Sequence, residues 1–300
     1  MPDSKRFLHP ETIRRIARLD VRARYIVEGF LSGAHRSPYF GQSVEFVQHR
    51  EYTKGDDLRR IDWKVWAKQD RYYVKQFEEE TNLRCTLLVD VSNSMRYGAG
   101  ALNKYEYGCT VAASLAWLLL RQQDAVGCVA FDSSSRVTVP IRNARSHLNS
   151  IIQSLDVAAP KDKTDLFGVL RQVAETTPRR GLIVLISDLL VDRPGLFKGL
   201  NLLRQRGHDV LLFHVMDDDE LDFPFNGPTR FEGLELDERL ACNPRALREG
   251  YLAALGTYLD EVRRGCAKYV VDYALLRTSQ PLDAALAAYL SNRLGMHGRN

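Results

Sequence analysis

From residue 72 onward, apolar positions alternate between short unbroken runs and longer stretches with helical spacing. Four nearly unbroken runs have the length of buried strands: LRCTLLVD (83–90), AVGCVAFD (125–132), GLIVLISD (181–188) and DVLLFHVMD (209–217). Between them, apolar residues recur about once per helical turn, as over residues 104–123. This alternation predicts an α/β fold with a doubly wound, mostly parallel sheet that helices cover on both faces.

The flanks of this pattern predict further elements. RVTVPI (136–141) alternates and contains a proline, which is typical of an edge strand. Toward the C-terminus we expect a helix over 244–264, a strand over 268–276 and a final helix from 281. YYVKQFEEE (72–80) also alternates, and it is expected to form a hairpin with the strand at 83–90.

The first 71 residues differ in character and predict an N-terminal layer, residues 1–71, on a domain of residues 72–300. Residues 10–30 have helical apolar spacing with arginines on the other side. Those arginines either form a solvated helix face or bind an anionic partner, and the first is commoner for such charge runs. Residues 31–71 are irregular and rich in aromatic and charged residues. We expect them to pack on the larger domain, while a role in docking a partner stays open.

Composition narrows the classes of function. The 300 residues include 42 basic and 38 acidic side chains, a net charge of +4 that is too small to argue for nucleic acid. The cysteines number five and form no C-x-x-C pair, which indicates free thiols in a reducing compartment. The N-terminus lacks the apolar core of a secretory signal, and no apolar run reaches the roughly 20 residues of a membrane helix. We therefore expect a cytoplasmic protein without a membrane span.

All four apolar runs end on an aspartate; Asp132 is expected to be a turn or cap residue, which leaves Asp90, Asp188 and Asp217 as the candidates. The carboxyl ends of parallel strands meet at one edge of a sheet, so these side chains are expected at the same edge. Moving a carboxylate out of water costs free energy unless a metal ion or a helix N-terminus compensates it. The strand ends therefore mark the candidate site.

Asp90 begins a D-x-S-x-S sequence with Ser92 and Ser94, and in a turn these alternate side chains can converge on one point. Carboxylate and hydroxyl oxygens are hard ligands that suit Mg²⁺ or Mn²⁺. Asp188 can approach from a neighbouring strand and Thr164 from the loop KTDLFG. These five residues are the predicted metal ligands, some of them acting through water.

Other polar residues receive structural interpretations. Asp217 is followed by two more aspartates and a glutamate, which predicts a solvated turn. The histidines, His214 among them, lack the spacing of metal ligands, so structural roles are expected.

Three short motifs resemble the metal-ion-dependent adhesion site of von Willebrand factor type A domains: DVSNSM (90–95), KTDL (163–166) and ISDL (186–189). The block SVEFVQHREYTKGDDLRRIDWKVWAK (43–68) resembles the domain-of-unknown-function-58 family of bacterial and archaeal proteins. That resemblance implies a von Willebrand A-like fold with strand order 3-2-1-4-5-6, in which the strands ending at Asp90 and Asp188 are neighbours. It also implies a frequent partner, a MoxR-type AAA+ ATPase. Many family members carry membrane helices before the shared block, and none is seen here.

Two functions follow from these residues. The favoured one is a non-enzymatic, Mg²⁺-dependent adaptor, in which an open coordination position accepts an acidic side chain of a MoxR-type ATPase or of its client. The alternative is a Mg²⁺-dependent phosphohydrolase of the haloacid-dehalogenase type, because those enzymes also place an aspartate at the end of the first strand. They resemble D-x-D, however, and Ser92 in place of the second aspartate cannot act as a general acid near neutral pH.

Overall fold

The computed structural model describes residues 18–34, 49–51, 73–75, 83–98, 100–156, 165–177, 180–234 and 239–289. The chain divides into two compact units, residues 1–33 with 83–300 and residues 34–82. In the second unit, β1 (His49–Glu51) pairs antiparallel with β2 (Tyr73–Lys75). The prediction of a hairpin between residues 72–80 and 83–90 is therefore wrong, because β2 pairs with β1, which precedes β2 in the chain. The expected division at residue 71 stays a prediction.

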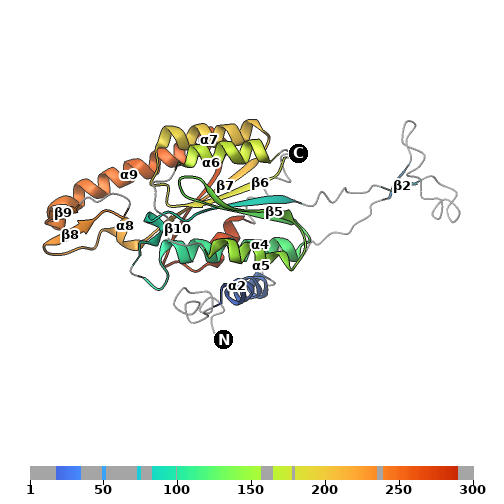
Figure 1. Ribbon diagram of the computed structural model, residues 1–300, viewed down its shortest axis with the longest axis horizontal. Coiled ribbons are helices and arrows are strands. Elements are labelled where there is room, and N and C mark those ends of the chain that lie inside the picture. The colour runs from blue at the N-terminus through green and yellow to red at the C-terminus, as the bar shows by residue number, and fades with distance from the viewer. Residues whose placement is uncertain are drawn as a thin grey trace. The chain divides into compact units, whose positions relative to one another are not determined.

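A six-stranded sheet forms the centre of the first unit (Figure 1). In spatial order its strands are β10 (Asp272–Arg277), β7 (Asp209–Met216), β6 (Leu182–Ser187), β3 (Arg84–Asp90), β4 (Ala125–Phe131) and β5 (Ser135–Arg142). All neighbouring pairs are parallel except β4 and β5, so β5 is the antiparallel edge strand that the proline pattern predicted. Numbered along the chain, the six strands follow the order 3-2-1-4-5-6, which confirms the expected von Willebrand A-like fold.

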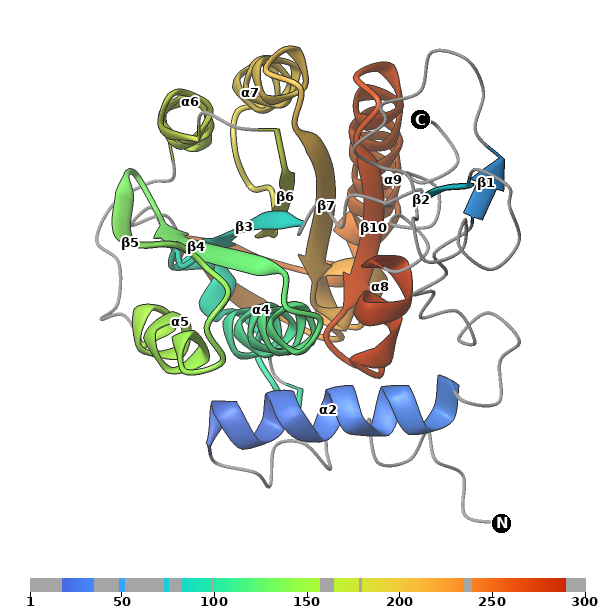
Figure 2. The same ribbon diagram turned by 90° about the vertical axis from the view of Figure 1, so that its right-hand side faces the viewer.

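Helices cover both faces of this sheet (Figures 1 and 2). One face carries α4 (Lys104–Arg121) and α5 (His147–Leu155), with α2 (Leu19–Ala34) packed outside them. The other carries α6 (Leu166–Thr176), α7 (Arg193–Gln205) and α9 (Pro244–Lys268). Within the described residues, no helix has the length and hydropathy of a membrane span.

The central strand β3 shows why its sequence is an unbroken apolar run. Leu87 and Val89 point into the core beneath α4, whereas Leu88 points into the core beneath α6 and α7. Because successive side chains of a strand face opposite ways, burial on both sides requires apolar residues at every position. Helix α2 joins the first of these cores through Ile26 and Val27, so this part of the N-terminal layer packs on the domain.

The order of the strands creates a switch point at the carboxyl ends of β3 and β6. The chain leaves β3 toward β4 on one side, and β6 lies on the other side of β3. Four small elements follow strands at this edge of the sheet: η4 (Ser94–Arg96) comes after β3, and α8 (Asp218–Asp222), β8 (Thr229–Glu232) and β9 (Arg239–Cys242) come after β7. In open α/β sheets, ligands bind at this kind of edge.

Candidate functional site

Asp90 is the last residue of β3 and is almost completely buried. Its Oδ1 accepts a hydrogen bond from the backbone N–H of Ser92 (2.9 Å), and its Oδ2 accepts one from the hydroxyl of Ser187 (2.6 Å). Among the described residues, no basic side chain forms an ion pair with this carboxylate. In the described part of the chain, Asp90 is thus a buried acid held by neutral donors.

The turn after β3 brings two hydroxyls beside each other. Ser92 and Ser94 are both buried, and their Oγ atoms lie 2.9 Å apart. Ser94 begins the short 3-10 helix η4, which follows the strand. The D-x-S-x-S spacing therefore places one carboxylate and two hydroxyls in a single turn, whereas Thr164 lies outside the described residues.

Asp188 lies directly after β6, the neighbour of β3, and is also buried. Its Oδ1 accepts from the backbone N–H of Leu190 (3.3 Å). The next residue, Leu189, has a positive φ of 55°, a conformation that costs a residue with a side chain about 1–2 kcal/mol. Hydrogen bonds hold this turn, since the N–H of Leu189 donates to Ser187 Oγ (3.0 Å) and its carbonyl accepts from Tyr258 (2.6 Å).

His214 supports the same turn from the neighbouring strand β7. Its Nε2 lies 2.9 Å from the carbonyl oxygen of Asp188, and its Nδ1 lies 2.9 Å from the hydroxyl of Tyr273. A carbonyl only accepts, so Nε2 carries the proton and Nδ1 accepts from Tyr273. Burial favours this neutral ring and lowers the pKa of His214 to about 4.

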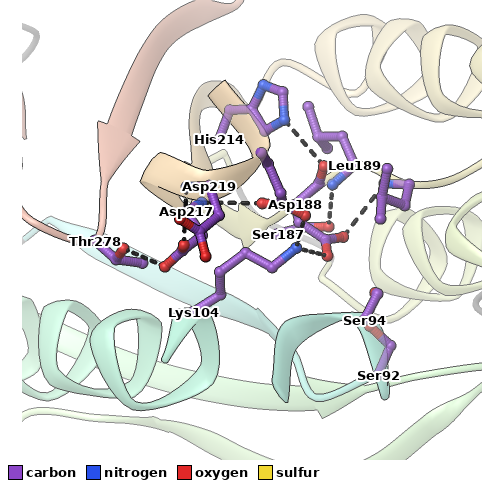
Figure 3. Close-up of polar contacts among 12 residues, drawn as sticks. Ser92, Ser94, Lys104, Ser187, Asp188, Leu189, His214, Asp217, Asp219 and Thr278 are labelled. Atoms are coloured by element: carbon purple, nitrogen blue, oxygen red, sulfur yellow. Dashed lines mark hydrogen bonds and ion pairs between the residues drawn. The ribbon is translucent and has the colours of Figure 1, made fainter. Parts of the chain in front are cut away.

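Lys104, the first residue of α4, is a part of the site that the sequence did not reveal. Its side chain is fully buried, and its Nζ donates to Asp188 Oδ2 at 2.8 Å (Figure 3). The same Nζ donates to Glu220 Oε1 at 2.7 Å. Burial disfavours the ammonium, but the two carboxylates outweigh it and raise the pKa of Lys104. Because lysines are rarely buried, a single lysine at the start of a helix does not predict a place in a buried site.

Among the residues that the structure describes, the buried charges around Asp90 and Lys104 do not balance. Burial, and then the negative charge of Asp188, raise the pKa of Asp90 to about 7, although hydrogen bonds from Ser187 and Ser92 oppose the shift. Lys104 is one positive charge set against the carboxylates of Asp90, Asp188 and Glu220. Such an excess of buried negative charge favours a proton or a cation next to Asp90.

The donor set fits a hard cation better than zinc. Asp90, Ser92 and Ser94 offer only oxygen atoms, as Mg²⁺ and Mn²⁺ prefer. Within the described part of the chain, no three histidine, cysteine or acidic side chains form a metal-binding group. A metal here would therefore depend on the serine hydroxyls as well as on Asp90. Asp188 is shared, because one of its oxygens already accepts from Lys104.

Asp217 corrects the expectation of a solvated turn. It is buried, with 3% of its surface exposed, and it is the N-cap of α8. Its Oδ1 accepts from the backbone N–H of Asp219 (3.1 Å), and its Oδ2 accepts from the hydroxyl of Thr278 (2.7 Å). The acidic residues after it begin a short helix, where negative charge is favourable, and Thr278 follows β10, which lies beside β7 in the sheet.

Two solved structures resemble this chain at low identity. BatB, a conserved hypothetical protein from Bacteroides thetaiotaomicron, is 18% identical with a TM-score of 0.46, and the match covers 72% of this chain and 98% of BatB. The von Willebrand A domain of SpRpn10 is 13% identical with a TM-score of 0.40, over 68% of this chain and 94% of that domain.

Sequence comparison gives more extensive matches. Uncharacterized proteins of Mycobacterium tuberculosis and Mycobacterium bovis are each 26% identical over 294 residues, which cover 95% of this chain and 90% of theirs. Residues 48–257 match the family described as "Protein of unknown function DUF58". Because this match spans more than half of the chain, the protein belongs to the DUF58 family and has a von Willebrand A-like fold.

Proposed function

We propose that this protein is a non-enzymatic binding module that holds Mg²⁺ or Mn²⁺ at Asp90, Ser92 and Ser94 and thereby binds an acidic side chain of a protein partner. Thr164 and Asp188 complete the proposed ligand set, Asp188 through a water molecule. The observation that carries the proposal is the state of Asp90, which is buried beside two hydroxyls and a second carboxylate but pairs with no described basic side chain. A cation would stabilise the charged form of this acid.

The neutral hydroxyls explain why such a site would recognise an acid. Mg²⁺ prefers six oxygen ligands and usually keeps several waters in proteins. Asp90 supplies one charge, while Ser92 and Ser94 supply none, so a bound ion keeps much of its attraction for anions. A carboxylate from another protein is the anionic oxygen ligand that such a partner can offer.

The surroundings of the two serines favour binding over catalysis. Their hydroxyls bond to each other, and in the described part of the chain no histidine contacts either of them. A nucleophilic serine needs an adjacent base, and a phosphohydrolase of the D-x-D type needs an acid at position 92. We therefore retain the adaptor over the phosphohydrolase.

Family resemblance suggests the partner. We propose that the acidic side chain belongs to a MoxR-type AAA+ ATPase or to one of its clients, and that the complex forms in the cytoplasm. A pull-down of the purified ATPase in Mg²⁺ and in EDTA tests this, with Ser92→Ala as the site variant. Capture that depends on Mg²⁺ and on Ser92 supports the proposal, and equal capture in EDTA contradicts it.

The metal itself is tested by isothermal titration of Mg²⁺ into the full chain. We expect binding by the wild type and a loss of at least about 100-fold, equivalent to about 2.7 kcal/mol, in Asp90→Ala. Asp260→Asn is the matched control, because it removes an exposed aspartate whose ion pair with Arg263 lies on the surface. Equal Mg²⁺ affinity in the wild type and Asp90→Ala would rule out this site.

A further inference from the structure

Lys104 links the candidate site to α8. Its ammonium lies between two carboxylates from different elements, Asp188 after β6 and Glu220 in α8. Its side chain is 0% exposed, while those of Asp188 and Glu220 are 2% and 18% exposed, so water screens these contacts only weakly. The adaptor mechanism does not use Lys104, although Lys104 contacts one of the proposed ligands directly.

We propose that Lys104 keeps the affinity of this site for a divalent cation low, so that metal binding depends on a carboxylate supplied by the partner. This inference rests on the proposed function. Lys104 donates to Asp188 Oδ2 at 2.8 Å and thus neutralises part of the charge that would attract a cation. A cation next to Asp90 would also lie close to the ammonium, and like charges repel strongly in a dry interior.

Glu220 limits this effect by sharing the ammonium. Its Oε1 accepts from Lys104, while its Oε2 accepts from the backbone N–H of Asp217 in the capping box of α8. Glu220 is therefore held in place by the helix start and draws positive charge away from Asp188. Its removal would leave Lys104 with Asp188 as its remaining carboxylate partner among the described residues.

A carboxylate from the partner would offset the effect of Lys104 on metal affinity. It adds a negative charge next to the cation and offsets the repulsion from Lys104. The metal and the partner then raise each other's affinity by the same factor, as thermodynamic linkage requires. The result is a site that binds weakly to the metal alone and tightly to the metal together with an acidic partner.

Titration of Mg²⁺ alone into the full chain tests this directly. We expect Lys104→Met to bind Mg²⁺ about tenfold more tightly than the wild type, or more, since about 1.4 kcal/mol of repulsion corresponds to that factor. Lys198→Met is the control, because it removes an exposed lysine from α7 and should leave the affinity unchanged. If Lys104 only maintained the fold, its loss would weaken Mg²⁺ binding instead.

Glu220→Gln should change the Mg²⁺ affinity in the opposite direction, and this variant keeps Lys104 in place. We expect Mg²⁺ to bind several-fold more weakly, with Asp222→Asn as the control for the loss of one charge from the same helix. Sodium acetate in place of sodium chloride, at equal ionic strength, should tighten Mg²⁺ binding more in the wild type than in Lys104→Met.

The outcomes separate this inference from the proposed function. Equal or weaker Mg²⁺ binding by folded Lys104→Met overturns the role of Lys104 and leaves the metal site standing. If that variant does not fold, unchanged or tighter binding by Glu220→Gln overturns the role instead. Absence of Mg²⁺ binding in both the wild type and Lys104→Met overturns the proposed function and this inference together.

Discussion

Asp90 and Asp217 occupy equivalent places and have opposite environments. Each is a buried aspartate at the carboxyl end of a parallel strand, and both lie at the same edge of one sheet. Asp217 caps α8 and accepts from Thr278, and it lies at the N-terminus of a helix, where negative charge is favourable. Asp90 accepts from Ser187 and from the N–H of Ser92, and the second carboxylate of Asp188 lies nearby.

The environments of Asp90 and Asp217 distinguish a candidate metal ligand from a structural acid. Burial alone does not distinguish them, because both side chains are almost fully covered. What distinguishes them is whether the fold supplies compensation for the charge. The fold compensates Asp217 with a helix terminus, whereas burial and Asp188 raise the pKa of Asp90, which marks an acid that still favours a proton or a cation.

The largest expected effect on stability comes from Asp217. Asp217→Ala removes the cap of α8 and leaves the hydroxyl of Thr278 without its acceptor, so we expect a loss of about 3 kcal/mol in the free energy of unfolding. Urea denaturation in EDTA measures it. The exposed Asp222→Ala should cost less than about 1 kcal/mol. A similar small loss for Asp217→Ala would mean that its burial carries no structural role.

Substitution of Asp90 should raise the free energy of unfolding, in contrast to substitution of Asp217. In EDTA we expect Asp90→Asn to raise the free energy of unfolding by about 1 kcal/mol or more, because the substitution removes a poorly compensated buried charge. The amide can still hydrogen-bond with Ser187, whose hydroxyl both donates and accepts. Thermal unfolding with and without Mg²⁺ completes the test, and stabilisation by Mg²⁺ should disappear in the variant. A loss of stability in Asp90→Asn as large as that in Asp217→Ala would show that Asp90 is also a structural acid.

The smallest effect is a pH dependence in which Asp90 and His214 act with opposite signs. The folded-state pKa of Asp90 is raised, so the folded protein binds the proton first and stability rises as pH falls from about 7. The folded-state pKa of His214 is lowered to about 4, so the unfolded chain binds the proton first and stability falls as pH drops below about 6.5. The two contributions oppose each other in the wild type.

Single variants expose each contribution. Between pH 7 and 5 in EDTA, we expect the stability of Asp90→Asn to fall with decreasing pH and that of His214→Gln to rise, each by about 1.4 kcal/mol per pH unit at most. Urea denaturation at pH 7, 6 and 5 measures both slopes. Slopes of equal sign in the two variants would contradict the assigned environments.

The sequence was sufficient for the parts of the molecule that depend on local pattern. Unbroken apolar runs identified four of the six strands of the sheet, because parallel strands covered on both faces require such runs, and alternation identified the edge strand β5. The spacing of Asp90, Ser92 and Ser94 was sufficient to place them in one turn, since all three lie within five residues.

The features that the sequence did not predict depend on tertiary contacts between segments far apart in the chain. Lys104 and Glu220 are 116 positions apart, and only the packing of α4 against the end of β7 brings them together. The acidic run after Asp217 predicts a solvated turn, but in the structure that run begins a short helix that Asp217 caps. The strand at Tyr73–Lys75 was given the wrong partner because alternation identifies a strand without identifying its neighbour.

An anomalous diffraction map from crystals of the full chain grown with Mn²⁺ tests most directly whether Asp90, Ser92 and Ser94 bind a metal ion. We predict a single strong peak about 2.1 Å from an oxygen of Asp90, with the hydroxyls of Ser92 and Ser94 also in contact. It should be absent from crystals of Asp90→Asn grown under the same conditions. A peak on the acidic residues of α8 instead, or no peak at Asp90 at saturating Mn²⁺, would contradict the proposed metal site.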